Sequence, residues 1–361
     1  MWHRLGPGVV VAIVCSLYVA VVLVNAGGDP LAFAVIGTRF SAGDVLGSEG
    51  YDGQFVYFIA RDPLDAARFL DVPAYRYQRI LYPLLAWLFS GGQPGVLPWT
   101  LILINLAAIV AGTCAVEQLL RGFGVNRWYA LAYGLYGRQL IALRTDLNEP
   151  LALALVSAAM LGWHRDRRWL AAVLFALASL TKETSLVFVA AYAIAALVQR
   201  RWRAVIALAC ATLPFALFQA TLWVVFGRPG LGAGGAGATP FSPVPLGGWL
   251  EVAGVSAPAF LTISVVAAPF VVLPAVIGTL MGLHDLLRRP WHPIALSLLL
   301  NSWMIMALPA STFREPAALL RLGGGLALSM ILYGAIRRLP RVQNYSLLWI
   351  LSNLVLLKGV A

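Results

Sequence analysis

Long apolar runs recur along this 361-residue chain, and they constrain its fold more than any other feature. A run of roughly 20 apolar residues lets one helix cross the hydrocarbon core of a bilayer, where each backbone polar group needs a partner within the protein. Charged residues make up only 11% of the chain, against about 25% in a typical soluble domain. We therefore expect an all-α fold, a polytopic transmembrane helical bundle in which residues 1–361 form a single transmembrane domain.

The apolar runs predict about eleven membrane spans. The first run is long and no clear A-x-A site follows it, so we expect an uncleaved helix rather than a signal peptide. The apolar segment Ile80–Ser90 is too short to cross, and we expect it to lie at the membrane surface or to re-enter. The predicted spans are Gly8–Ala26, Trp99–Leu120, Trp128–Ala142, Pro150–Trp163, Trp169–Thr181, Ser185–Gln199, Val205–Phe226, Ala257–Leu283, Ile294–Ala310, Ala317–Ile336 and Ser346–Leu357.

Arginine clusters occupy every second connection between these spans. By the positive-inside rule, those connections and the amino terminus face the cytoplasm. The net charge of +11 is then a signal of topology, and we expect no nucleic-acid partner. The pattern predicts a multi-pass protein of a bacterial cytoplasmic (inner) membrane. The clusters are residues 121–127, 164–168, 200–203, 288–289 and 337–341.

Two long connections fall on the outer side, at residues 27–98 and 227–256. In the first, Gln54–Ala60 and Leu64–Leu70 have the pattern of short amphipathic helices, broken at Asp62–Pro63, that lie at the membrane interface. The second is rich in glycine and proline. It is either a mobile linker or a lid that becomes ordered over a bound substrate.

Polar residues gather in short groups that this topology brings to the outer side. Lys182 and Glu183 lie between two apolar runs, and ionisable groups near membrane depth usually face a cavity or a partner. The alternative for Lys182 is a side chain that reaches up to the outer headgroups. The groups are Tyr51–Gln54, Arg76–Arg79, Arg144–Pro150 and Thr181–Thr184, with Arg314 and Glu315 as a smaller fifth.

Carboxylates and arginines in these groups suggest chemistry on a phosphorylated substrate. Asp52 is a candidate general base, or simply the start of a turn before Gln54. Asp146 or Glu149 is a candidate second acid, although Asn148-Glu149-Pro150 is also typical of a helix start. Another pair, Arg76 and Arg79, is suited to bidentate contact with a phosphate, or to anchoring the chain at the interface.

Four sequence motifs resemble the GT-C superfamily of integral-membrane glycosyltransferases, which use polyprenyl-phosphate sugars. They are YDGQFVYFIARDP after the first span, PAYRYQRILYPLLAW, DLNEP before a span, and LASLTKETSL. The resemblance covers roughly residues 45–190 and is greatest to bacterial mannosyltransferase-like members and the PIG-V-like branch. It implies interfacial helices in the first outer loop.

The resemblance also implies an activity and roles for individual residues. We expect inverting transfer of a sugar from a polyprenyl-phosphate donor to a glycan, lipid or protein acceptor at an outer active site, with membrane lipid around it. Members of the superfamily have two nearby acids in the first outer loop, which here correspond to Asp52 and, less closely, Glu49. The expected donor phosphate ligands are Arg76, Arg79, Lys182 and Arg314, and the expected orienting residues are Tyr51, Gln54 and Glu183.

We expect no cofactor and no essential metal, since cations alone can stabilise a departing phosphate monoester. A diphosphate donor would favour a divalent metal, with Asp52 and Glu183 as candidate ligands. The three cysteines lie inside apolar runs without metal-binding spacing. Two other classes of function remain open, a transporter or lipid flippase and a non-catalytic scaffold. A transporter predicts polar residues spread through the spans rather than gathered at one face.

Overall fold

The structure, a computed structural model, describes residues 5–235 and 237–358, and this part of the chain consists of helices and turns without a β-strand. The all-α prediction is thereby confirmed. Four helices are long and apolar enough to cross a membrane, and a fifth joins them if the bent pair α18 and α19 is counted as one span. The four are α1 (Pro7–Asn25), α6 (Leu97–Gly122), α12 (Trp202–Phe226) and the run Ala257–Arg288, which comprises α14 (Ala257–Ala267), the π-helical turn η6 (Ala268–Val272) and α15 (Leu273–Arg288).

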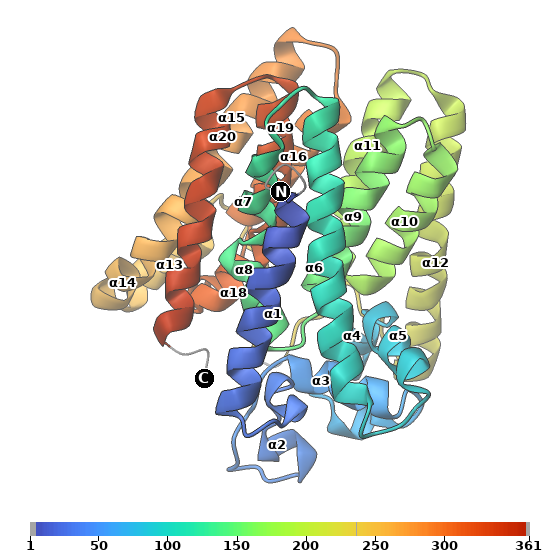
Figure 1. Cartoon of the computed structure of the whole chain (residues 1–361), viewed down its shortest axis with the longest axis vertical. Coiled ribbons are helices and arrows are strands. Elements are labelled where there is room, and N and C mark those ends of the chain that lie inside the picture. Colours follow the sequence, from blue (N-terminus) through green and yellow to red (C-terminus); the bar gives the residue numbers. More distant parts are fainter. Residues whose placement is uncertain (1–4, 236, 359–361) are drawn as a thin grey trace.

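Shorter apolar helices occupy several of the other predicted spans. Helices α9 and α10 pack along each other, and α9 also lies against α6 (Figure 1). Taken singly, none of these helices is long enough to qualify as a span, and only the pair α18 and α19 qualifies when it is counted as one, so the number eleven is not reached by this criterion. They are α9 (Glu149–His164), α10 (Arg168–Thr181), α11 (Leu186–Val198), α16 (Pro293–Met306) and the pair α18 (Pro316–Leu322) and α19 (Gly324–Ile336).

Two predicted spans differ in kind from a continuous α-helix. Residues 128–142 form three pieces, η4 (Arg127–Ala130), α7 (Leu131–Gly134) and α8 (Gly137–Arg144). The break allows close packing, because a β-carbon on Gly134 would lie 2.4 Å from Thr113 Oγ1 and one on Gly137 would lie 2.6 Å from Ser352 Oγ. The last predicted span, Ser346–Leu357, falls on the 3-10 helix η7 (Leu347–Lys358), which directly follows the short helix α20 (Pro340–Ser346).

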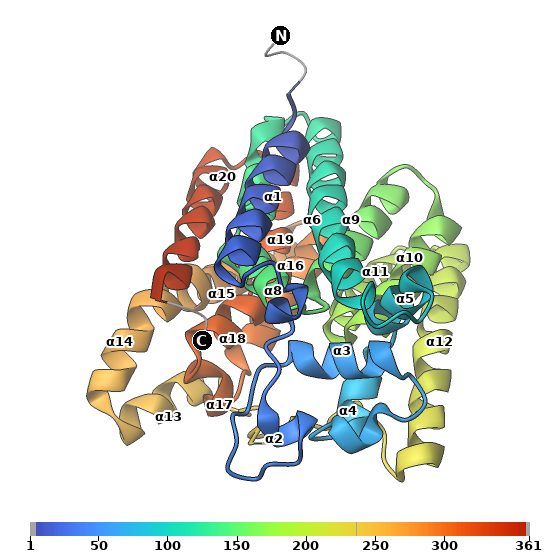
Figure 2. The same cartoon turned by 60° about the horizontal axis from the view of Figure 1, so that its bottom comes forward.

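The first long connection, residues 27–98, folds into short helices at one end of the bundle (Figures 1 and 2). The predicted helix around Gln54–Ala60 is present as α3, and it ends at the expected break before Asp62. Ten-residue α5 is too short to cross, as predicted, and it exposes Trp87, Leu88 and Phe89. The elements are η2 (Pro30–Phe33), α2 (Thr38–Ser41), α3 (Gly53–Arg61), η3 (Ala66–Phe69), α4 (Pro73–Tyr77) and α5 (Leu81–Ser90).

The glycine-rich second connection packs onto the first. Gln219 Oε1, near the end of α12, accepts hydrogen bonds from the amides of Gly230 and Leu231. Farther on, a β-carbon on Gly235 would lie 2.9 Å from Arg76 Nη2. The connection then leads into α13 (Gly247–Val255), beside α17 (Ala310–Phe313). This part of the chain therefore lies directly against the arginine-bearing segment of the first connection.

Candidate functional site

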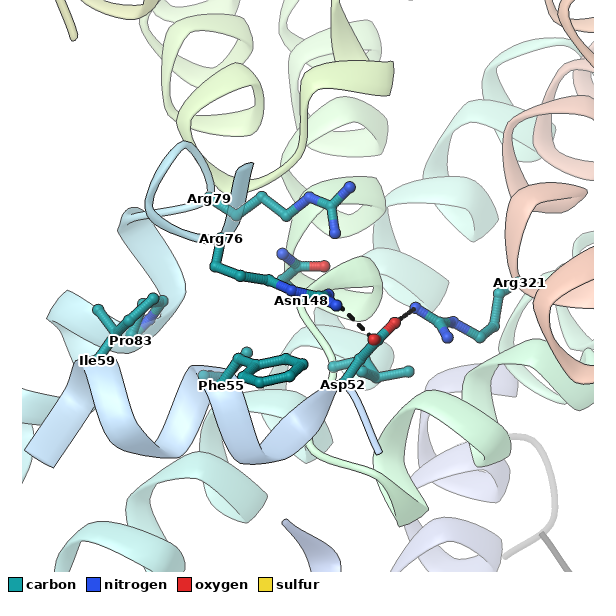
Figure 3. A pocket seen from close by; sticks show the side chains of 10 residues that line it. Asp52, Phe55, Ile59, Arg76, Arg79, Pro83, Asn148 and Arg321 are labelled. Atoms are coloured by element: carbon teal, nitrogen blue, oxygen red, sulfur yellow. Dashed lines mark hydrogen bonds and ion pairs between the residues drawn. The ribbon is translucent and has the colours of Figure 1, made fainter. Parts of the chain in front are cut away.

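Asp52 lies immediately before α3, between two guanidinium groups from distant parts of the chain (Figure 3). Its Oδ1 accepts a hydrogen bond from Arg76 Nη1 at 3.0 Å, and its Oδ2 accepts one from Arg321 Nη2 at 3.0 Å. Gly53 fixes this position, because a β-carbon there would lie 2.0 Å from the carbonyl oxygen of Thr145. The absence of a side chain at residue 53 thus lets α3 begin against the loop that precedes α9.

Arg76 is held on three sides. Besides Asp52, it donates to Asp71 through Nε at 2.7 Å and through Nη2 at 2.8 Å. Its guanidinium carbon lies 4.2 Å from the centre of the Phe55 ring, within the range of a cation–π contact. The bidentate contact with Asp71 fixes the plane of the guanidinium, and this leaves one edge directed at Asp52.

A second set of ion pairs lies deeper, around Glu149 at the start of α9. Its Oε1 accepts hydrogen bonds from Lys182 Nζ at 2.5 Å and from Arg321 Nη2 at 3.0 Å. Arg321 thereby connects Glu149 to Asp52. Nearby, Arg79 donates to both carboxylate oxygens of Glu183, at 2.9 and 2.6 Å.

The four polar groups and the smaller fifth therefore meet in space. Tyr51 completes the contact, because its hydroxyl donates to Glu315 Oε1 at 2.6 Å and accepts from Arg321 Nη1 at 2.9 Å. Sequence reasoning missed Arg321, since it lies inside the predicted span Ala317–Ile336. An arginine within an apolar run was nevertheless a usable signal, because intramembrane charges usually serve a site.

Electrostatics keep Asp52 ionised. Burial raises the pKa of its carboxyl, but the positive charges of Arg76 and Arg321 outweigh burial and hold that pKa well below the usual value. The side chain of Asp52 is still 33% exposed, so a ligand can reach it. Asp52 is thus a charged, accessible hydrogen-bond acceptor. Its basicity depends on how strongly Arg76 and Arg321 interact with it.

Lys182 shows the opposite balance. Burial lowers the pKa of its ammonium group to about 8, and the negative charge of Glu149 opposes this effect only in part. Lys182 is 5% exposed and lies between α10 and α11, with its ammonium group paired to Glu149. A small change in its surroundings would therefore change its charge near neutral pH.

A small cavity borders Asp52. Arg76, Arg79 and Arg321 line one part of it, and an apolar wall lines another, formed by Phe55, Val56, Ile59 and Pro83. Its water-accessible volume is about 20 Å³, which is room for about one ordered water. A larger ligand would have to separate the ion pairs that close the cavity.

Four predicted site residues take no part in the ion pairs of the cluster. Glu49 is 74% exposed and pairs with Arg39, because the turn before Tyr51 directs it outward. Gln54 is buried but bonds to the backbone of Gly37 and Glu49, so it holds the loop together. Asp146 is fully buried, and neither of its carboxylate oxygens has a hydrogen-bond partner among the described residues. Arg314 is exposed after α17 and takes no part in the cluster's ion pairs.

The donor set gives little support to a metal ion. Within residues 5–235 and 237–358, no group of three or more histidine, cysteine, aspartate or glutamate side chains is placed to hold one. The two candidate ligands, Asp52 and Glu183, both face guanidinium groups in this arrangement. A cation would have to displace those arginines first, because like charges repel at this distance.

Comparison of the chain with protein-family models, with curated proteins and with solved structures found no match.

Proposed function

We propose that this chain is a GT-C-type membrane glycosyltransferase that moves a sugar from a polyprenyl-phosphate donor to an acceptor at the outer face of the membrane. One observation carries the proposal, namely the accessible carboxylate of Asp52 between Arg76 and Arg321. A carboxylate suits the acceptance of a proton, and guanidinium groups suit the stabilisation of a departing phosphate. The apolar wall beside them is compatible with a lipid-linked donor.

In the proposed reaction, Asp52 accepts the proton of the acceptor hydroxyl while that oxygen attacks the anomeric carbon of the sugar. The bond from this carbon to the phosphate oxygen breaks, and its electron pair leaves with the polyprenyl phosphate. Because this is a single displacement, the configuration at the anomeric carbon inverts. Arg76, Arg79 and Arg321 offset the charge that grows on the leaving phosphate.

The ion pairs of Asp52 suggest how donor binding prepares the base. While Arg76 and Arg321 are directed only at Asp52, its carboxylate is a weak base. A donor phosphate that binds the same guanidinium groups shares their positive charge, and Asp52 then becomes more basic. Proton transfer is thereby favoured only once the donor is in place.

The distribution of arginines along the chain is the basis for the proposed membrane topology. We propose that the shorter helices complete about eleven spans, with the amino terminus in the cytoplasm and Asp52 on the outside, in a bacterial inner membrane. The support is that Asp52 lies at the start of α3, and that α3 and the other short helices of the first connection gather at one end of the bundle (Figure 2). A transporter, the alternative function, would need polar residues on a path to the opposite face as well.

The test is transfer of label from polyprenyl-phosphate sugars to membrane acceptors by the purified full-length protein. We expect labelled acceptor with the wild type and a loss of roughly 100-fold or more with Asp52→Asn. The matched control is Glu49→Gln, because this carboxylate lies three residues away but outside the cluster. A wild-type rate in Asp52→Asn would remove Asp52 from the base role. Movement of label across vesicles without transfer would favour a transporter instead.

A further inference from the structure

Arg138, on α8, is a buried cation that has no carboxylate at ion-pair distance. It is 3% exposed, and within the described parts of the chain no aspartate or glutamate oxygen lies within 4 Å of it. Its Nε donates to the carbonyl oxygen of Arg321 at 2.9 Å, and its Nη1 has only a long contact of 3.5 Å with Gln139 Oε1. A buried charge without a counter-ion is costly and needs an explanation.

Arg138 borders a second cavity, which we call the Arg138 cavity. Lys182 and Arg321 also line it, with Glu149 as the one carboxylate and Ser185 and Asn301 as neutral hydrogen-bonding groups. Arg321 lines the Asp52 cavity as well, so the two cavities meet at this side chain. The water-accessible volume of the Arg138 cavity is about 20 Å³, enough for about one water.

The charges around this cavity do not balance. Among the residues that line the cavity, Glu149 is the one carboxylate beside Arg138, Lys182 and Arg321. Asp52 compensates Arg321 from the other side. One positive charge therefore remains without a negative partner, and it lies on the wall of a cavity rather than in packed apolar surroundings.

Glycines beside this cavity leave room for its polar side chains. Three glycines, residues 323–325, lie where α18 and α19 meet at an angle of 44°. A β-carbon on Gly324 would lie 2.3 Å from Arg138 Nε, and one on Gly325 would lie 2.2 Å from Asn301 Oδ1. The start of α19 borders the cavity at Gly325, and the positive end of its helix dipole favours an anion there.

From these observations we propose that the Arg138 cavity is a second oxyanion subsite, which binds a terminal carboxylate or phosphate group with Arg138, Lys182 and Arg321. Because the cavity holds about one water, its walls must open slightly to admit such a terminal group, and they would have to open much farther to admit a whole sugar ring. The subsite supplies the negative charge that Arg138 lacks. This inference does not rest on glycosyl transfer, because it concerns anion binding alone.

A purely structural role for Arg138 is the alternative. Its Nε donates a hydrogen bond to the carbonyl oxygen of Arg321, near the end of α18. A positive charge is favourable at the carboxyl end of a helix. That role would not require any ligand. The two explanations differ in whether added anions bind saturably through Arg138.

The experiment measures the thermal unfolding midpoint of the full-length protein in detergent against rising sodium phosphate or sodium acetate, with sodium chloride at equal ionic strength as the blank. A ligand that binds only the folded state raises the midpoint in a saturable way. We expect a rise of about 2 °C or more with at least one of the two anions. A response to phosphate alone assigns a phosphate group, and a response to acetate assigns a carboxylate.

Variants locate the binding. We expect Arg138→Gln to lose the saturable rise and Arg138→Lys to keep part of it. Ala152→Leu, which fills the cavity and keeps every charge, should also lose it, and this variant decides the question if Arg138→Gln does not fold. Arg79→Gln, beside Asp52, should keep it. The proposal is overturned if neither anion binds saturably, if Arg138→Gln and Ala152→Leu respond like the wild type, or if only Arg79→Gln loses the response.

Discussion

Arg321 Nη2 lies 3.0 Å from Asp52 Oδ2, although 269 positions separate the two residues along the chain. The same nitrogen lies 3.0 Å from Glu149 Oε1. One guanidinium group near the bend between α18 and α19 therefore joins the first long connection to the start of α9. This contact makes a single cluster out of charges that the sequence places in separate segments.

The ion pairs of Glu149 should contribute measurably to stability. Glu149→Gln leaves Lys182 and Arg321 buried with less negative charge near them, and we expect the free energy of unfolding to fall by about 3 kcal/mol. Chemical denaturation of the purified protein in detergent measures this change. The control is the exposed Glu251 on α13, for which Glu251→Gln should stay within about 0.5 kcal/mol of wild type. Equal stability of the two variants would mean that the ion pairs of Glu149 contribute no net stability.

Close packing at Gly53 should be needed to place Asp52. In Gly53→Ala the new β-carbon would lie 2.0 Å from the carbonyl oxygen of Thr145, so α3 must shift. We expect a loss of about 1–3 kcal/mol in the free energy of unfolding, together with a lower transfer rate. Gly254→Ala is the matched control, because its β-carbon meets nothing within 4 Å. An unchanged transfer rate in Gly53→Ala would show that Asp52 tolerates a displacement of its helix.

The charge of Lys182 should set the pH dependence of donor binding. Its pKa is about 8, so the ammonium is charged below this pH and loses its proton as the pH rises through it. If it contacts the donor phosphate, the donor KM should rise above pH 8, approaching about tenfold per pH unit. The acceptor KM should change less.

The control for this prediction keeps the positive charge at all pH values tested. Arginine does not lose its proton in this range, so Lys182→Arg should show no rise in the donor KM near pH 8. A rise of the same size in both proteins would assign the pH dependence to another group.

Cysteine labelling should test the membrane orientation. In a background with Cys15, Cys114 and Cys210 replaced by alanine, we expect a membrane-impermeant maleimide to label Asp44→Cys in intact cells. Asp166→Cys, in an arginine-rich turn, should react only after permeabilisation. Both positions are exposed, so accessibility within the protein does not limit the reaction. Labelling of both from the same side would contradict the proposed topology.

The sequence was sufficient for the class of fold and for much of the cluster. Long apolar runs leave helices as the structure that satisfies the backbone in lipid, and the break at Asp62 and the short length of α5 could be read from local pattern. Polar motifs also identified Asp52, Arg76, Arg79, Glu149 and Lys182 as residues of one site. These features depend on local composition and spacing, which the sequence contains directly.

Only the tertiary structure decided which charges meet. Glu49 and Asp52 lie three residues apart in the same loop, yet a turn directs Glu49 to solvent and the packing of Gly53 holds Asp52 against Arg76 and Arg321. Arg321 looked like a residue of an apolar helix, and only the packing of α18 near the bend at three glycines places it beside Glu149. Pairing between distant residues depends on how helices pack, and side-chain packing across the bundle is not encoded in any one segment.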